Sequence, residues 1–378
     1  MFQRRSKLAT AGVAKSVEQE QEANVLVIYT GGTIGMLRNQ SGVYEPKSNY
    51  MIPELKKFPM FHDKSQSETN GSNLLVTPLM RNGKRVVYRI KEYSPLLDSS
   101  NMSMDDWSKI ANDISLYYDK YDGFVVLHGT DTMAYTASAL SFMCENLGKP
   151  IVVTGSQIPI YEVRSDGRDN FLSALVVASQ YKIPEVLVVF GNKVLRGNRT
   201  IKNDSGSFDA FISPNIASIA DLGTDITVNS FLVLQRDTTQ QFYVHRDICK
   251  NVGLLRLFPG ISEQLVRSFL QPPMQGVVLQ SYGAGNAPDN CPGILRAIKE
   301  AIKREVIIVN ITQCTRGFVD ASYATGKALY DQGVIPGGDM TADAAFTKLS
   351  YVLSKASLSN KTKTEMMKQN LRGECTTR

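Results

Sequence analysis

The sequence is poor in histidine and in cysteine. Its 378 residues contain three histidines and five cysteines. No two cysteines form a Cys-x-x-Cys pair, and no cluster of histidine, cysteine and carboxylate residues has the spacing of metal ligands. These absences argue against a disulfide framework and against a zinc site or other metal site. We therefore expect reduced thiols, a cytoplasmic location, and neither a metal nor a cofactor.

Long apolar runs and clusters of one charge are also missing. No run approaches the roughly 18 residues that a membrane helix needs. The net charge of +6 comes from basic residues that are spread along the chain, so we expect neither a membrane nor a nucleic acid as partner. A composition of 43% hydrophobic and 21% charged residues is typical of a soluble globular protein, and the length fits two domains.

Residues 1–23 are predicted to form a flexible, polar N-terminal extension. Basic residues at positions 4, 5 and 7 precede a short, weakly apolar stretch, which faintly resembles a targeting peptide. The acidic run at 18–22 favours an extension over a mitochondrial presequence.

From residue 25 onward, apolar runs alternate with helical patterns. This alternation is typical of βαβ units around a mainly parallel sheet flanked by helices. It loosens over 191–245 and restarts near 247–253. We predict a larger N-terminal α/β domain over 24–235 and a smaller C-terminal α/β domain over 250–378. The expected strands are 25–28, 85–93, 124–128, 150–155, 186–190, 254–257, 277–280 and 306–310. The expected helices begin near 104, 132, 168, 261, 291, 341 and 361, and the one that begins at 132 is expected to reach 147.

Two of the predicted strands end in glycine-flanked polar turns. The strand at 25–28 runs into a Gly-Gly-Thr turn with Thr33, and the strand at 124–128 runs into a turn with Thr130 and Asp131. Because open α/β sheets bind ligands at the carboxyl ends of their strands, we expect the two turns to share one site. The segment 36–60 has little periodicity, and we expect a loop that acts as a lid.

A hydroxyl nucleophile such as Thr33 needs a group that accepts its proton. His62 and His245 are expected at the surface, and His128, at a strand end, favours a structural role. Lys202 is a further candidate, but a lysine must be buried or near another cation to be neutral at pH 7. These residue types alone leave open whether Thr33 is a nucleophile or only caps its turn. The chain lacks a Gly-x-Ser-x-Gly elbow, and its glycine spacing fits neither dinucleotide-binding nor P-loop motifs.

The two polar turns lie within a family signature. Residues 29–35 (Tyr-Thr-Gly-Gly-Thr-Ile-Gly) and 123–133 (Gly-Phe-Val-Val-Leu-His-Gly-Thr-Asp-Thr-Met) resemble the two motifs of cytosolic, bacterial-type (type I) L-asparaginases. Further similar stretches are 97–102, 153–159, 196–199, 281–286 and 370–374, so the resemblance covers roughly 24–375. It implies a two-domain asparaginase/glutaminase-like fold and hydrolysis of L-asparagine to L-aspartate and ammonia.

The resemblance also implies roles for single residues. Thr33 resembles the nucleophile that forms an acyl-enzyme, and Tyr44 resembles the lid tyrosine that assists it. Lys202 would accept a proton through Thr130, which would activate the water that releases aspartate. The implied substrate-binding residues are Asp131 for the α-ammonium group, Ser99 with Asp98 and Ser100 for the α-carboxylate, Thr130, and Asn286 contributed by a neighbouring subunit of a homodimer or dimer of dimers.

One residue departs from the pattern of the family. Some type I enzymes bind a second, regulatory asparagine through an arginine at the position of Gln280, and glutamine cannot supply that charged, bidentate contact. Cys314 and Thr312 lie in the same neighbourhood, so allosteric control stays open.

Other functions remain possible within and outside this family. One is hydrolysis of glutamine, or the glutaminase component of a tRNA amidotransferase, which usually carries extra domains. Another is the lysophospholipase activity linked with a mammalian relative that also has ankyrin repeats, of which we find none. A non-enzymatic alternative is a protein that binds asparagine without turnover.

Overall fold

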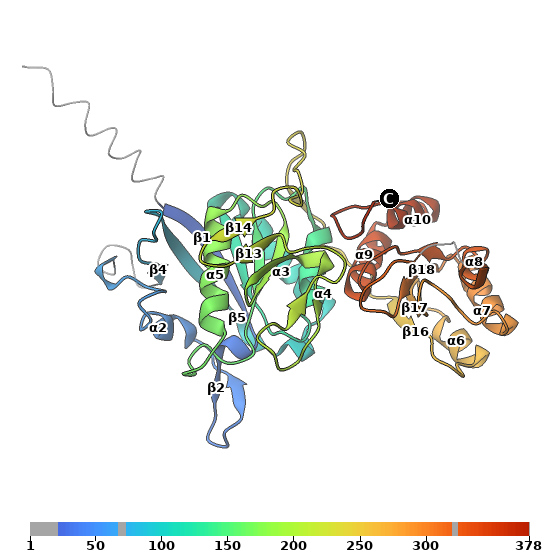
Figure 1. Ribbon diagram of the computed structural model, residues 1–378, viewed down its shortest axis with the longest axis horizontal. Coiled ribbons are helices and arrows are strands. Elements are labelled where there is room, and N and C mark those ends of the chain that lie inside the picture. The colour runs from blue at the N-terminus through green and yellow to red at the C-terminus, as the bar shows by residue number, and fades with distance from the viewer. Residues whose placement is uncertain (1–21, 67–72, 320–323, 378) are drawn as a thin grey trace, which may run out of the picture.

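The computed structural model describes residues 22–66, 73–319 and 324–377 (Figure 1). The chain has a two-domain α/β fold with a larger N-terminal and a smaller C-terminal sheet, as predicted. The predicted extension over 1–23 lies almost entirely outside the described residues, and its last two residues already belong to the first strand.

The larger sheet has nine strands in the order β14-β13-β10-β9-β8-β6-β1-β5-β4. Its five central strands, from β9 to β5, are parallel, while the strands at both edges pair antiparallel. The sheet is therefore mixed, with a parallel centre. The bounds in sheet order are Ile226–Val228, Ala220–Leu222, Lys193–Arg196, Val186–Phe190, Ile151–Thr154, Gly123–Leu127, Glu22–Gly31, Arg85–Leu97 and Leu74–Val76.

Helices cover both faces of the parallel centre, which explains why its strands are apolar throughout. Leu26 and Ile28 of β1 pack toward α3 (Met104–Tyr117) and α4 (Met133–Met143). Val25 and Val27 pack on the other face, toward α5 (Gly167–Gln180) and α2 (Met51–Leu55). The alternation follows from the two-residue period of a strand. Because β1 is packed on both faces, its carboxyl end is held in place.

The smaller sheet contains four parallel strands in the order β16-β17-β18-β19. Helix α9 packs between this sheet and α4 of the larger domain, so the two domains share an interface (Figure 1). The strands span Val252–Arg256, Gly276–Ser281, Ile307–Thr312 and Ile335–Pro336, and the helices α6 to α10 span Glu263–Phe269, Pro292–Lys303, Ala324–Tyr330, Ala342–Ser354 and Asn360–Lys368.

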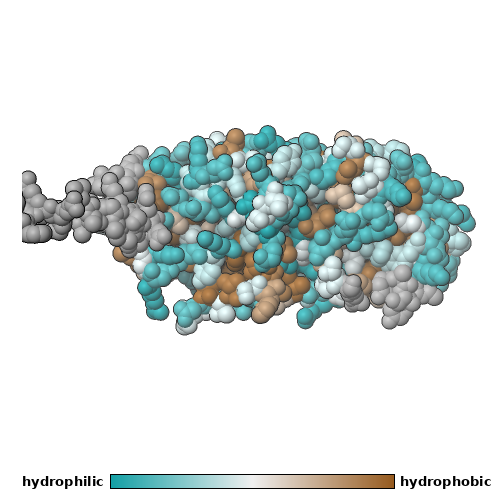
Figure 2. All heavy atoms as spheres, turned by 90° about the horizontal axis from the view of Figure 1, so that it is seen from above, coloured by the Kyte–Doolittle hydropathy of each residue, from teal (hydrophilic) through white to brown (hydrophobic). Residues whose placement is uncertain are grey.

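Hydrophilic residues cover most of the face shown in Figure 2, and hydrophobic residues gather in a patch near its middle. Among the described helices, none is long and apolar enough to cross a bilayer.

Two local predictions, one about the length of a helix and one about burial, were wrong. The helix expected over 132–147 ends at Met143, because Cys144 and Glu145 form strand β7 and pair with β15 (Tyr243–Val244). His62 is buried rather than at the surface, with its Nδ1 3.4 Å from the N–H of Val76. The loosely patterned region 191–245 contributes β10, β13 and β14 to the larger sheet, because antiparallel edge strands carry no long apolar run.

Candidate active site

The carboxyl ends of three neighbouring strands, β1, β5 and β6, meet at one edge of the larger sheet. The N–H of Gly32 donates to the carbonyl of Leu97 at 3.0 Å. A Cβ on Gly32 would lie 2.4 Å from the Cα of Gly129, and a Cβ on Gly129 would lie 2.5 Å from the Oγ of Ser99. The three polar turns that follow these strands are thus in direct contact, which only glycine at positions 32 and 129 permits.

Thr33 begins the 3₁₀ turn η1 (Thr33–Gly35) at the end of β1. Gly31 and Gly32 before it have φ values of +131° and +84°, which residues with a side chain rarely adopt. Thr33 itself is half-buried, and its hydroxyl makes no hydrogen bond to another described residue. The turn therefore presents a hydroxyl at a fixed position.

Thr130, Asp131 and Lys202 form an assembled group beside that turn. The Nζ of Lys202, on β11 (Ile201–Lys202), lies 2.8 Å from the Oγ1 of Thr130 and 2.7 Å from the Oδ1 of Asp131. The Lys202 side chain is 17% exposed and that of Asp131 64%. From the sequence, we expected that Lys202 would have to be buried or close to another cation in order to be neutral at pH 7. The structure supplies partial burial and a neighbouring carboxylate instead.

Gln157 is a residue of this group to which sequence reasoning gave no role. Its Oε1 lies 3.5 Å from the Oγ1 of Thr130, and its Nε2 donates to the carbonyl of Ser207. The buried carboxylate of Asp166 accepts the N–H groups of Gln157 and Ile158 and so holds this turn. Burial raises the pKa of Asp166, and these backbone donors partly offset the rise. The sequence could have pointed to Gln157 through its position, because it follows β8, and β8 is the neighbour of β6, the strand that ends at the turn of Thr130.

Tyr44 lies on a hairpin of β2 (Met36–Arg38) and β3 (Tyr44–Pro46) that projects from the domain (Figure 1). The Tyr44 hydroxyl donates to Glu162 at 2.8 Å and accepts from Arg38 at 2.8 Å. Arg38 also bonds Glu162 at 3.1 Å, and its guanidinium lies 4.9 Å from the Tyr44 ring centre. Among the described residues, the Tyr44 hydroxyl thus contacts Arg38 and Glu162, not Thr33. The segment expected to be a loop is a hairpin followed by α2.

The third polar turn contains Asp98, Ser99 and Ser100, and only some of its polar groups contact the other two turns. Ser99 is buried behind Gly129, and its carbonyl accepts the hydroxyl of Thr132 at 2.8 Å. The carboxylate of Asp98 accepts both the N–H and the hydroxyl of Ser100, which is exposed. Ser99 is therefore the member of this turn that lies against the turn of Thr130.

His128 lies directly before the Thr130 turn and is fully buried. Its Nδ1 is 2.7 Å from the carbonyl of Gly129, which can only accept, so Nδ1 carries the proton. Its Nε2 then accepts from the hydroxyl of Thr136 at 2.8 Å. Burial lowers the pKa of His128 to about 4. His128 is therefore a packed, hydrogen-bonded side chain, as expected. His245 is half-buried and bonds Ser354.

Asn286 and Gln280 lie in the C-terminal domain, at the end of β17. The backbone of Asn286 pairs with Tyr282 in a short turn. The end of β17 is far from the β2–β3 hairpin of the same chain in Figure 1. The turn of Asn286 therefore lies away from the hairpin of its own chain.

The arrangement favours nucleophilic attack on a carbonyl group. The turn that carries Thr33 contacts the turn of Thr130, whose hydroxyl is bonded to Lys202. The described ranges hold no group of three histidine, cysteine or carboxylate side chains that could bind a metal. All five cysteines are free thiols.

Models of two protein families match most of the chain. Residues 24–233 match "Asparaginase, N-terminal", and residues 251–367 match "Glutaminase/Asparaginase C-terminal domain".

Individual relatives agree with these matches. The chain is 53% identical to an L-asparaginase of Dirofilaria immitis and 46% identical to a human 60 kDa lysophospholipase, over 95% and 94% of its length. It spans 61% and 62% of those two proteins, or about three fifths of each. The crystal structure of L-asparaginase I from Vibrio cholerae is 44% identical, with a TM-score of 0.82, and covers 94% of this chain and 100% of that one.

Proposed function

Because the chain belongs to the asparaginase/glutaminase family, we propose that it hydrolyses L-asparagine to L-aspartate and ammonia. The observation that carries this proposal is the contact of Lys202 with Thr130 and Asp131, directly beside the Gly32–Thr33 turn. That set contains a nucleophile, a proton-transfer group and a carboxylate for the substrate.

In the first half of the reaction, the Oγ of Thr33 attacks the side-chain amide carbon of asparagine. The carbon–nitrogen bond breaks, and ammonia leaves with the proton of the Thr33 hydroxyl. The product is an aspartyl ester of Thr33. Tyr44 assists the proton transfer after the hairpin has moved its hydroxyl from Glu162 toward Thr33. Backbone N–H groups near Thr33 and Thr130 stabilise the oxyanion.

In the second half, water attacks the ester carbon, the bond between that carbon and the Thr33 oxygen breaks, and aspartate leaves. Thr130 takes the proton of that water and passes its own to Lys202, which must be neutral at that moment. The proton taken from the water is finally returned to the Thr33 oxygen, which restores the Thr33 hydroxyl and the neutral lysine. Asp131 is paired with Lys202 in the free protein. We propose that the α-ammonium group of the substrate binds Asp131, weakens its pairing with Lys202 and places a second cation nearby. The substrate thereby supplies the cation that sequence reasoning required.

The remaining contacts to the substrate would be made by residues of the third polar turn and of a second copy of the chain. Ser99, with Asp98 and Ser100 beside it, would hold the α-carboxylate group. Asn286 of a neighbouring copy would complete the site, which makes a homodimer, or a dimer of dimers, the working unit. The chain is proposed to be a cytoplasmic, type I enzyme, and Gln280 in place of arginine favours a non-cooperative response to asparagine.

The test is ammonia release by the purified protein over a wide range of L-asparagine and L-glutamine concentrations. Thr33→Ala should lower kcat at least about 10³-fold, because it removes the atom that forms the ester. Thr30→Val is the matched control, since the Thr30 hydroxyl only donates to the carbonyl of Leu127. Full activity of Thr33→Ala would disprove the mechanism, and a sigmoidal curve would show that a regulatory site exists despite Gln280.

A second candidate is hydrolysis of a lysophospholipid ester, which the name of the human relative suggests. The same nucleophile could attack an ester carbonyl. Release of fatty acid from lysophosphatidylcholine, abolished in Thr33→Ala and unaccompanied by ammonia release from asparagine, would favour this candidate over the first.

A further inference from the structure

The 3₁₀ turn η5 (Gly197–Arg199) ends three residues before Lys202 and is fully buried. A Cβ on Gly197 would lie 2.9 Å from the carbonyl of Val186 on β9 and 3.1 Å from that of Ala137 on α4. The turn is thus wedged between the sheet and α4, the helix that begins just after Thr130 and Asp131. Any shift of η5 therefore moves the start of β11 relative to α4.

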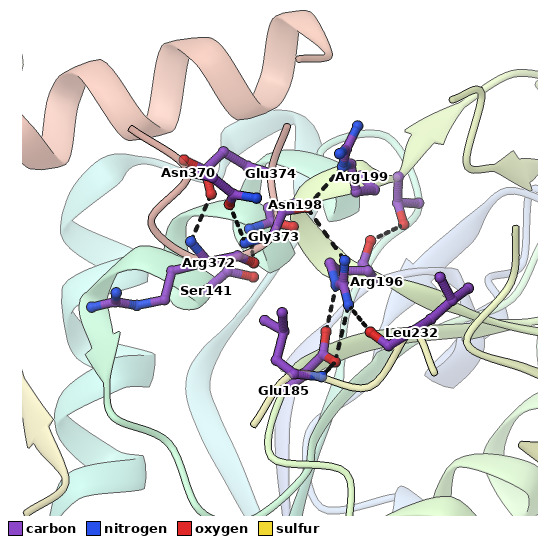
Figure 3. A network of polar contacts seen from close by, with 12 residues as sticks. Ser141, Glu185, Arg196, Asn198, Arg199, Leu232, Asn370, Arg372, Gly373 and Glu374 are labelled. Carbon is purple, nitrogen blue, oxygen red and sulfur yellow. Dashed lines mark hydrogen bonds and ion pairs between the residues drawn. The ribbon is translucent and has the colours of Figure 1, made fainter. Parts of the chain in front are cut away.

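The C-terminal domain holds η5 through backbone carbonyls of one short segment. Asn198 donates to the carbonyl of Arg372 at 2.9 Å, and Arg199 donates to that of Gly373 at 2.8 Å (Figure 3). Arg196, which precedes η5, reaches the same Gly373 carbonyl at 3.4 Å while its other nitrogens bond Glu185. Three side chains of the larger domain thus bind two consecutive carbonyls of the smaller one.

Arg199 is also the centre of a buried ionic group. Its Nη1 lies 2.9 Å from the carboxylate of Asp339, and its Nη2 lies 3.3 Å from the hydroxyl of Thr376. Thr376 donates its N–H and its hydroxyl to the same carboxylate. Burial alone would raise the pKa of Asp339, but the bonds from Thr376 and Arg199 outweigh burial and lower it.

Gly373 fits this contact because it lacks a side chain. Its φ is +76°, and a Cβ there would lie 2.7 Å from the Nη1 of Arg196. That arginine is ion-paired with Glu185 and 7% exposed, so it cannot easily move away. The segment 372–376 is therefore shaped to meet η5.

We propose that Asp339, Gly373 and Thr376 of the C-terminal domain are positioning residues for Lys202, acting through Arg199. This proposal rests on the proposed function, in which Lys202 serves the deacylation step. Strand β11 has only two residues and, among the described strands, pairs only with β12 (Phe211–Ile212). The contacts of Arg199 hold the chain in place just before this short strand. Residues of the C-terminal domain thereby fix the position of Lys202 in the active site of the N-terminal domain.

The test compares Asp339→Asn and Thr376→Val, which weaken the contacts of Arg199 without changing any residue of the N-terminal domain. The matched control is Asp113→Asn. Asp113 is also a buried carboxylate, bonded to Lys91 and Tyr93, but it lies on α3. Each protein is assayed at a temperature at which circular dichroism shows it fully folded. Rapid-quench measurements of ammonia and aspartate then separate acylation from deacylation.

A misplaced Lys202 should slow deacylation selectively. We expect kcat to fall about 10-fold in Asp339→Asn and Thr376→Val with KM within about twofold, as for a small misplacement of a catalytic group. Ammonia should then appear in a burst close to one equivalent of enzyme, ahead of aspartate. Asp113→Asn should show no added burst.

Two results would overturn the proposal: unchanged kcat in both variants, or a loss of rate without a change in the burst. Both leave the proposed function intact, as long as the wild-type protein releases ammonia from asparagine. Failure of the wild-type protein to release ammonia would instead reject the proposed function itself.

Discussion

The Thr130 half of the candidate active site and the Thr33 half differ in how their side chains are held. Thr130, Asp131 and Lys202 are already joined by bonds of 2.7 and 2.8 Å. In the other half, the Thr33 hydroxyl has no described partner, and the Tyr44 hydroxyl bonds Arg38 and Glu162.

The difference follows from the elements that carry each half. Thr130 and Asp131 stand between a buried strand and α4, while Lys202 follows the buried turn η5. Tyr44 stands on a two-stranded hairpin, and such hairpins are marginally stable by themselves. We infer that the water-activating half is preorganised, whereas the half that forms the ester must be completed by movement of the hairpin when substrate binds.

The largest expected effect is on the preorganised half. Lys202→Met should lower kcat by about 10³–10⁴-fold, because it removes the proton acceptor of deacylation. The acyl-enzyme on Thr33 should accumulate and be visible in the mass spectrum of the intact protein. Lys91→Met is the control, since Lys91 also pairs with a carboxylate, Asp113, but outside the site. Equal activity losses in both variants would show that Lys202 is structural.

A smaller effect is expected on the mobile half. Tyr44→Phe should lower kcat by about 10²-fold, since it removes one hydroxyl that assists proton transfer to the leaving group. No acyl-enzyme should accumulate, because acylation becomes the slow step. Single-turnover assays of ammonia release measure this directly.

Glu162→Gln is the control for Tyr44, because it weakens the contact that holds the hairpin and leaves the tyrosine in place. Glu162 and Arg38 are both partly or largely exposed, so their pairing contributes little. We expect kcat to change less than about threefold. A loss as large as that of Tyr44→Phe would make Glu162 part of the chemistry and would remove the contrast between the two halves.

The sequence allows prediction wherever short-range patterns decide the structure. The apolar run at 25–28 and the glycines at 31 and 32 predict a buried strand and a tight turn, because strand burial and φ are local properties. The same holds for the start of α3, where both the N–H and the hydroxyl of Ser103 donate to Asp106.

Long-range contacts were beyond such patterns. The bond from Lys202 to Asp131 joins residues 71 positions apart, and that from Tyr44 to Glu162 joins residues 118 apart. The periodicity of the sequence predicts neither the contact of Glu162 with Tyr44 nor that of Gln157 with Thr130. The burial of His62 likewise depends on how the segment before β4 folds back on the sheet edge, which composition does not predict.

The smallest expected effect concerns His128, whose neutral ring holds the turn of the preorganised half. Its pKa is about 4 in the folded protein and about 6.5 in an unfolded chain. Above pH 6.5 both states are neutral. Between pH 6.5 and 4 only the unfolded chain binds the proton, so this group lowers stability as the pH falls, by about 3 kcal/mol in total.

His128→Gln removes this titration, so its free energy of unfolding should fall less steeply between pH 7 and 4 than that of the wild-type protein. Asp343, whose pKa burial raises to about 6, titrates in the same range with the opposite sign but is common to both proteins. Urea denaturation at several pH values therefore isolates His128 as the difference between the two curves. Parallel curves would mean that the ring accepts a proton in the folded state, and that a neutral His128 is not what fixes the Thr130 turn.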